Sequence, residues 1–267
     1  MSRFVAPIRR YDTAKGHYYK DANGARVPGV TTIQDKGLPK PALINWAANA
    51  TAEYAVDHWD ELGELKPAAR LKRLQGARYE VKDEAARRGT EVHRAAEQLL
   101  AGKDVKVPEE IAGHVEAYAR FLDEFQVRPI HVEFSCISYR WGYAGTADLY
   151  AELTIPDKGP VLALNDLKTT RSGIFGDAAL QLAGYRYAEF WVVGDEEIEP
   201  PQVDYCFGIH VRGDGYDLVP VEVGEQEHKD FLYAQRVGMF ADRSRDLIGA
   251  PIIAPTTSTF RLTREPQ

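Results

Sequence analysis

The sequence of 267 residues has little of what several protein classes depend on. It contains only two cysteines, Cys136 and Cys206, and no C-x-x-C spacing, which excludes a zinc ribbon or an iron–sulfur cluster held by four thiolates. No glycine-rich phosphate loop follows a predicted strand, which argues against a nucleotide or sugar enzyme of the α/β type. Both cysteines lie in predicted strands, and we expect them to be buried and reduced.

Long apolar runs are also lacking. No segment approaches the roughly 18 apolar residues of a membrane-spanning helix, and the first ten residues lack the apolar centre of a signal peptide. Hydrophobic residues make up 44% of the chain and charged residues 27%, which is typical of a globular protein with a core. We therefore expect a cytoplasmic protein with no membrane partner.

Positive charge is in the minority, because the formal net charge is -7. Nucleic-acid phosphates attract positive charge, so this value counts against a nucleic-acid partner. Metal ions or a local basic patch can still supply the required field. One such patch is expected on two predicted helices, where it comprises Arg70, Lys72, Arg73, Arg78, Arg87 and Arg88.

The predicted helices and strands follow an order that favours a mixed α/β fold. Asn23-Gly24 between strand-like segments predicts a β-hairpin near the N-terminus. Apolar periodicity predicts helices over residues 42–60, 66–74, 80–100, 111–125, 178–193 and 226–246. Strands are predicted over residues 130–139, 146–153, 161–168, 203–211 and 216–221.

We expect residues 1–267 to form a single domain, since no linker or internal repeat divides them. Within it, residues 1–80 are expected to form an N-terminal hairpin and helical elaboration. Residues 85–222 form the core that carries the chemistry, and residues 251–267 form a loose C-terminal tail.

Two charged residues at the end of a buried strand are the most informative feature. Val161–Leu164 is an apolar run typical of such a strand, and Asp166 and Lys168 follow it. Side chains two residues apart on a strand point to the same face, so this carboxylate and ammonium should lie together. Buried charges are costly unless they pair, bind an ion or take part in chemistry.

A second carboxylate is expected nearby, because Asp148 lies on the preceding strand just after the turn-forming Gly145. Neighbouring strands are about 4.8 Å apart, so Asp148 and Asp166 can share a divalent cation if their registers match. Carboxylate oxygens favour Mg²⁺ or Mn²⁺ over Zn²⁺. Lys168 can then orient or deprotonate an attacking water. Glu133 is either a further carboxylate of the site or a solvated edge residue.

The next predicted helix and the loop before it add polar side chains. Gln181 and Tyr185 are four residues apart and share a helix face. Gln181 can hydrogen-bond an attacking water or a phosphate oxygen, and Tyr185 is expected to contact a strand backbone or the substrate. Thr169 and Arg171 are candidates for phosphate contacts, with an ordinary solvated loop as the alternative.

Taken together, these stretches resemble the motifs of the PD-(D/E)XK nuclease superfamily, in its RecB-like branch. The matching stretches are Gly145-Thr146-Ala147-Asp148, Asp166-Leu167-Lys168-Thr169, Gln181 with Tyr185, and Gly89-Thr90-Glu91-Val92-His93. Residues 27–32 and 40–46 also look like phage-encoded exonucleases of this branch. Relatives with an iron–sulfur cluster need four cysteines, so the chain is similar to the cluster-free members.

The resemblance implies a restriction-endonuclease-like central sheet flanked by helices. It also implies that His93, Asp148, Asp166 and the Leu167 carbonyl hold Mg²⁺ or Mn²⁺, with Lys168 catalytic. The implied activity is hydrolysis of DNA phosphodiester bonds by a phage exonuclease serving recombination, replication or repair in the host cytoplasm.

The partners implied are DNA, a single-strand annealing protein and further copies of the chain. Two alternatives stay open: an endonuclease or nickase with the same site, and a non-cleaving DNA-binding component of a recombination complex.

Overall fold

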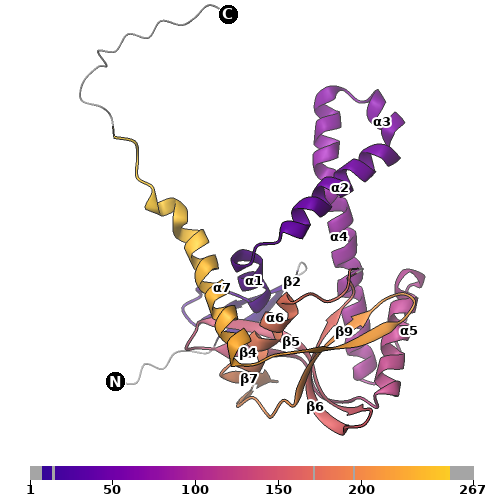
Figure 1. Ribbon diagram of the computed structural model, residues 1–267, viewed down its shortest axis with the longest axis vertical. Coiled ribbons are helices and arrows are strands. Elements are labelled where there is room, and N and C mark those ends of the chain that lie inside the picture. Colours follow the sequence, from indigo (N-terminus) through magenta and orange to yellow (C-terminus); the bar gives the residue numbers. More distant parts are fainter. Residues whose placement is uncertain (1–7, 14–15, 171, 195, 253–267) are drawn as a thin grey trace, which may run out of the picture.

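The computed structural model describes residues 8–13, 16–170, 172–194 and 196–252 (Figure 1). Its main sheet has seven strands in the order β10-β9-β6-β5-β4-β7-β8. Their bounds are β4 (Arg128–Ser138), β5 (Tyr143–Ile155), β6 (Gly159–Lys168), β7 (Phe190–Val193), β8 (Glu196–Ile198), β9 (Tyr205–Val211) and β10 (Tyr216–Val221). Strands β6 and β9 run parallel, and the other neighbouring pairs run antiparallel. The predicted mixed α/β fold is confirmed.

A three-stranded sheet, which we call the N-terminal sheet, precedes the main one. It consists of β1 (Arg9–Thr13), β2 (Gly16–Lys20) and β3 (Arg26–Val27). The hairpin expected at Asn23-Gly24 joins β2 to β3, and Gly24 adopts the positive φ of 80° that favours glycine in such turns. After β3, Gly29 bridges to Ala144 of β5, and the Ala144 N–H donates to the Pro28 carbonyl. The two sheets are therefore joined through the backbone.

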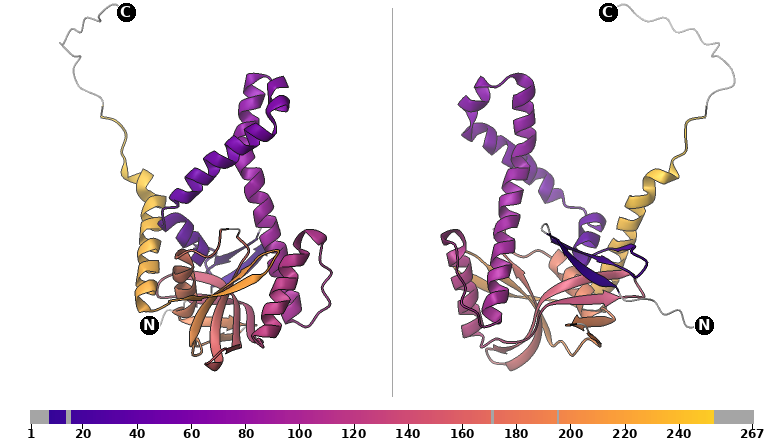
Figure 2. Two further views of the ribbon diagram at one scale, coloured as in Figure 1. Left: turned by 45° about the vertical axis from the view of Figure 1, so that its right-hand side comes forward. Right: turned by 180° about the vertical axis from the view of Figure 1, so that it is seen from behind.

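Helices cover both faces of the main sheet. Their bounds are α1 (Val30–Gly37), α2 (Pro41–Asp57), α3 (Trp59–Glu64), α4 (Pro67–Leu100), α5 (Glu109–Glu124), α6 (Asp177–Arg186) and α7 (Glu225–Arg243), followed by the 3₁₀ helix η1 (Ser244–Leu247). The C-terminal half of α4 packs with α5 on one face, and α1, α6 and α7 pack on the other. Figures 1 and 2 show that α2, α3 and the N-terminal half of α4 project from the body as a helical arm. Among the described residues, no helix has the length and apolar character needed to cross a membrane.

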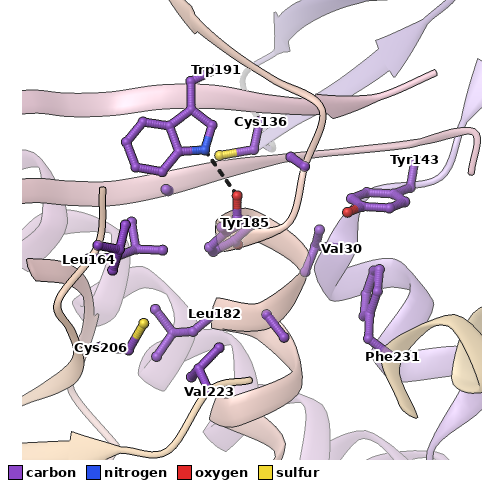
Figure 3. Close-up of a cluster of buried hydrophobic side chains, with 14 of the residues drawn as sticks. Val30, Cys136, Tyr143, Leu164, Leu182, Tyr185, Trp191, Cys206, Val223 and Phe231 are labelled. Carbon is purple, nitrogen blue, oxygen red and sulfur yellow. Dashed lines mark hydrogen bonds between the residues drawn. The ribbon is translucent and has the colours of Figure 1, made fainter. Parts of the chain in front are cut away.

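The core under α1, α6 and α7 fixes the position of α6 (Figure 3). The indole N–H of Trp191 donates to the carbonyl oxygen of Tyr185 at 3.0 Å, which ties the end of α6 to β7. Leu182 of α6 is fully buried in the same cluster. The cluster also contains both cysteines, free and buried as predicted, Cys136 and Cys206. Because α6 is held in this way, Gln181 lies next to the end of β6.

The helices predicted over 66–74 and 80–100 are in fact one helix of 34 residues, α4. The expected break fell near Gly76, which lies inside α4 with open space around its Cα. Glycine inside a helix costs only about 1 kcal/mol, and the neighbouring Leu, Arg, Gln and Ala residues favour helix enough to offset it. A lone glycine was therefore too weak a signal for a helix end.

Two further predicted boundaries were wrong. The helix expected over 178–193 ends at Arg186, and Phe190–Val193 forms strand β7. These aromatic and β-branched residues pair with β4, and such residues favour strands. The helix α1 was not predicted, because the segment around Val30 has the β-branched composition of a strand. Packing of α1 against α6 and α7 outweighs that local preference.

Contact between α1 and α7 gives a test of this packing. A Cβ added at Gly37 would lie 2.1 Å from the carbonyl oxygen of Ala234, whereas one at Gly76 would meet nothing within 4 Å. We expect Gly37→Ala to lower the free energy of unfolding by about 1–3 kcal/mol through overpacking. Gly76→Ala should raise it by about 1 kcal/mol, because alanine favours helix. Urea unfolding of both variants measures this difference, and equal effects would contradict the packing described.

Candidate functional site

A cleft of about 1230 Å³ lies between the N-terminal sheet, α1, α4, α6 and α7. Its lining includes the predicted site residues that the structure describes, His93, Asp148, Asp166, Leu167, Lys168, Thr169, Gln181 and Tyr185. Arg171, the other residue expected to contact phosphate, lies outside the described residues. The fold thus brings α4, β5, β6 and α6 together around one space.

At the end of β6, Asp166 and Lys168 point to the same face, as strand geometry requires. The Lys168 Nζ lies 2.7 Å from Asp166 Oδ2. Only 2% of Asp166 is exposed, so its charge is almost completely removed from water. Pairing with Lys168 offsets part of the cost of burying this carboxylate.

Gln181 ties this pair to α6. Lys168 Nζ donates to Gln181 Oε1 at 2.8 Å, and Gln181 Nε2 donates to Asp166 Oδ1 at 2.7 Å. The same Nε2 lies 3.1 Å from the hydroxyl of Tyr185, to which it also donates. Both ends of the amide are therefore engaged. Gln181 is therefore placed to orient Asp166 and Lys168, and its predicted contact with water or phosphate stays a prediction.

Tyr185 holds Gln181 in place by accepting a hydrogen bond from its amide. It is 2% exposed, and its ring packs against Gly145 of β5. A Cβ at Gly145 would lie 2.5 Å from Cε1 of Tyr185 and 2.8 Å from Cγ2 of Val30, so glycine permits this close approach. The structure thus shows the predicted contact of Tyr185 with a strand, and its contact with substrate stays a prediction.

A second cluster in the site consists of His93 of α4, Glu133 of β4 and Asp148 of β5. His93 Nδ1 is 3.8 Å from Asp148 Oδ1 and 4.0 Å from Glu133 Oε1. His93 Nε2 lies 3.1 Å from the Leu167 carbonyl oxygen. The Leu167 N–H in turn donates to Asp148 Oδ2 at 2.7 Å. The backbone of Leu167 therefore links the cluster to the β6 strand that carries Asp166.

Glu133, which the sequence left open, belongs to this cluster. The pairing of Val132 with Leu149 and of Phe134 with Ala147 places Glu133 opposite Asp148. Its φ is +49°, in the left-handed region that non-glycine residues rarely adopt. Such backbone conformations cost about 1–3 kcal/mol and are concentrated at functional sites. Sequence periodicity cannot reveal that a single residue has a positive φ. The sequence therefore could not show that Glu133 belongs to this cluster.

Two carboxylates of the site, Glu133 and Asp166, resist ionisation. Burial and the charge of Asp148 raise the pKa of Glu133 to about 7. Burial raises the pKa of Asp166 to about 6, although the ammonium of Lys168 acts in the opposite direction. Burial lowers the pKa of Lys168, but the charge and hydrogen bond of Asp166, together with the charges of Asp148 and Asp177, outweigh this effect and the pKa is raised. A cation near Glu133 and Asp166 would stabilise the ionised forms of both.

The cluster is a candidate cation site, with one imidazole and two carboxylates as possible donors. Octahedral ligands at about 2.1 Å from a Mg²⁺ or Mn²⁺ ion lie roughly 3–4 Å from one another. The candidate ligand atoms of His93, Glu133 and Asp148 all lie within 4.8 Å of one another. Asp166 Oδ2 is buried and lies 2.7 Å from the ammonium of Lys168, which already supplies it with a positive partner. Glu133 is thus a further candidate ligand beside His93 and Asp148, and the predicted part of Asp166 in the metal site stays a prediction.

Thr169 and the arginines of the expected basic patch contact other parts of the protein. Thr169 is half-buried, and its Oγ1 lies against Gly89 of α4. In the expected basic patch, Arg70 donates to backbone carbonyls at the end of α3, including that of Leu62. Arg87 pairs with Glu91 and Glu110. These arginines hold helices together, so the patch has less free charge than its sequence indicated.

No family model matches the chain, and no curated protein matches it. The arrangement of side chains in the cleft, together with the motif resemblance, is therefore the basis for assigning a function. The relevant observation is that two groups, Asp166–Lys168–Gln181 and His93–Glu133–Asp148, meet at Leu167.

Repulsion between Glu133 and Asp148 can be tested without metal. In EDTA at pH 8, Glu133→Gln should raise the free energy of unfolding by about 1 kcal/mol, since it removes a half-buried charge beside another carboxylate. Glu152→Gln, on β5 and paired with Arg128, is the matched control. It should change the value by less than about 0.5 kcal/mol. Destabilisation by Glu133→Gln in urea unfolding would show that the repulsion is absent.

Proposed function

We propose that this protein is a Mg²⁺- or Mn²⁺-dependent deoxyribonuclease that hydrolyses DNA phosphodiester bonds. The observation that carries the proposal is the meeting of a His93–Glu133–Asp148 cluster with the Lys168–Asp166 pair in one cleft. Metal-dependent phosphodiester hydrolysis uses a metal site for the phosphate and a proton-handling group, and these two clusters would supply both. The motifs shared with RecB-like nucleases support the same assignment.

In this proposal each residue has a separate task. His93, Glu133 and Asp148 would hold the cation, with the Leu167 carbonyl and Asp166 close by. When bound, the cation polarises the phosphate and neutralises developing charge. Lys168 is an ammonium, because its pKa is raised; it would orient the attacking water by a hydrogen bond and can give a proton to the departing oxygen. Gln181 keeps Lys168 and Asp166 in register, and Tyr185 holds Gln181.

Cleavage of labelled DNA tests the activity. The protein is incubated with end-labelled linear duplex, single-stranded and closed circular DNA in Mg²⁺, Mn²⁺ or EDTA. We expect cutting that depends on the metal and is reduced at least 100-fold by Lys168→Ala and by Asp148→Asn, which remove the proton-handling group and a ligand.

Matched controls are Lys103→Ala and Asp123→Asn, two exposed residues outside the cleft lining. Both should cut like the unsubstituted protein. Release of mononucleotides from linear ends, with circles left intact, supports an exonuclease. Cutting of closed circles supports the endonuclease or nickase. DNA binding without any cutting supports the non-cleaving component, and would contradict the enzyme.

The ligand chemistry also predicts a metal preference. Imidazole and later transition ions favour each other, so His93 should make the site bind Mn²⁺ more tightly than Mg²⁺. Isothermal titration of the DNA-free protein measures both affinities. His93→Ala should weaken Mn²⁺ binding by about tenfold or more and reduce the preference. His58→Ala, on the helical arm, should leave both affinities unchanged.

Other features of the proposal rest on the resemblance alone. Exonuclease action in phage recombination, replication or repair stays a prediction, as does work with a single-strand annealing protein. Assembly of several copies and a place in the host cytoplasm are predictions of the same kind. The cleavage assay with linear and circular DNA addresses the first of them directly.

A further inference from the structure

An arginine from the N-terminal sheet reaches the candidate site. Arg10 of β1 lines the same cleft as the metal cluster. Its Nη1 lies 3.2 Å from Thr146 Oγ1, to which it donates, and 3.8 Å from Glu133 Oε2. Thr146 stands two residues before Asp148 on β5. The guanidinium is therefore beside both the metal cluster and the strand that carries Asp148.

The N-terminal sheet is held firmly at this point. The hydroxyl of Tyr19 and the Thr146 Oγ1 are 2.5 Å apart, in a buried hydrogen bond. Tyr19 itself is 2% exposed and packs with Ile137 and Ala144 of the main sheet. The sheet is thus docked by a buried side chain as well as by its backbone link to β5. Arg10, opposite Tyr19 in the β1–β2 register, has its backbone position fixed by this contact.

The guanidinium has donors left over. Its Nε donates to Asp12 Oδ1 at 2.9 Å and its Nη1 to Thr146. Within the described residues Nη2 donates to no acceptor. The contact with Glu133 is a loose ion pair at 3.8 Å. Arginine has five N–H donors in a planar fork, which matches two oxygens of a phosphate. Arg10 therefore has unused donors in the lining of the cleft. Its acidic partner Glu133 would also contact a bound cation, which would weaken the ion pair with Arg10.

We propose that Arg10 binds a phosphate of the DNA strand at or next to the bond that is cut, so that the N-terminal sheet forms one wall of the substrate site. This inference rests on the proposed function, because it places DNA in the same cleft. The alternative is that Arg10 only neutralises Glu133. The two differ in what is lost when Arg10 is replaced: a phosphate contact in one case, and a neighbour of the metal ligands in the other.

DNA affinity measured at several salt concentrations separates the two roles. Binding of a fluorescein-labelled DNA duplex with a single-stranded overhang is followed by anisotropy in Ca²⁺, with the DNA checked for integrity on a gel. Each phosphate contact contributes about -0.9 to the slope of log K against log salt concentration. Arg10→Ala should weaken binding about tenfold and make the slope less negative by about one. Arg10→Lys should keep the slope but bind more weakly than the unsubstituted protein, because it lacks the fork.

The matched control is Arg128→Ala, an arginine on β4 that is 77% exposed and pairs with Glu152 outside the cleft lining. It should leave affinity and slope unchanged. Isothermal titration with Mn²⁺ alone gives the second readout. An unchanged slope together with tighter Mn²⁺ binding in Arg10→Ala would show that Arg10 only neutralises Glu133, and would overturn the inference. Circular dichroism confirms that each variant is folded.

The outcomes also distinguish this inference from the proposed function. If the unsubstituted protein cuts DNA and Arg10→Ala has the normal slope, the nuclease stands and the role of Arg10 is wrong. If the protein binds DNA with the expected loss of slope in Arg10→Ala but does not cut, the phosphate contact stands and the enzyme is wrong. If it neither binds nor cuts, both are wrong.

Discussion

Burial of the Asp166 carboxylate at the end of β6 is the constraint on which the rest of the site depends. A carboxylate that is 2% exposed requires partners, and Lys168 and the Gln181 amide supply them. Gln181 has this position only because α6 is held by the Trp191 and Tyr185 contacts. The apolar core on that side of the sheet therefore determines the polar geometry in the cleft. A change in the core would shift Gln181 and so the positions of Asp166 and Lys168.

The second half of the site is arranged around an unfavourable contact. Glu133 faces Asp148 across β4 and β5, with its backbone in a left-handed conformation. Without a ligand, both the left-handed backbone and the repulsion between the two carboxylates lower the stability of the folded protein. A cation between the two carboxylates would turn the repulsion into attraction. Stability is thus reduced at the point where ligand binding would restore it, as in many functional sites.

The sequence predicted the fold class and one half of the site well, for identifiable reasons. Asp166 and Lys168 follow an apolar strand, and strand alternation alone places them together. The convergence of His93 with Asp148 came from a motif resemblance. Glu133 was left open because its position depends on a backbone reversal that no pattern encodes. The contribution of Arg10 was missed, since its neighbour Thr146 is 136 residues away in the chain. The helix end expected near Gly76 is absent because neighbouring helix-forming residues outweigh one glycine, and the helix expected over 178–193 ends at Arg186 because Phe190–Val193 favours a strand.

The separation of 136 residues between Arg10 and Thr146 has a consequence during synthesis of the chain. A ribosome adds about 5–20 residues per second, so the N-terminal sheet would leave it roughly ten seconds before residue 146 is available to receive it. During that interval the Tyr19 ring and the edge of β3 have no docking partner from the main sheet. Premature pairing of this small sheet with another nascent chain is the hazard that such a topology carries. The sheet has polar and charged residues at exposed positions, among them Asp12, His17 and Arg26, and exposed residues of this kind discourage such pairing.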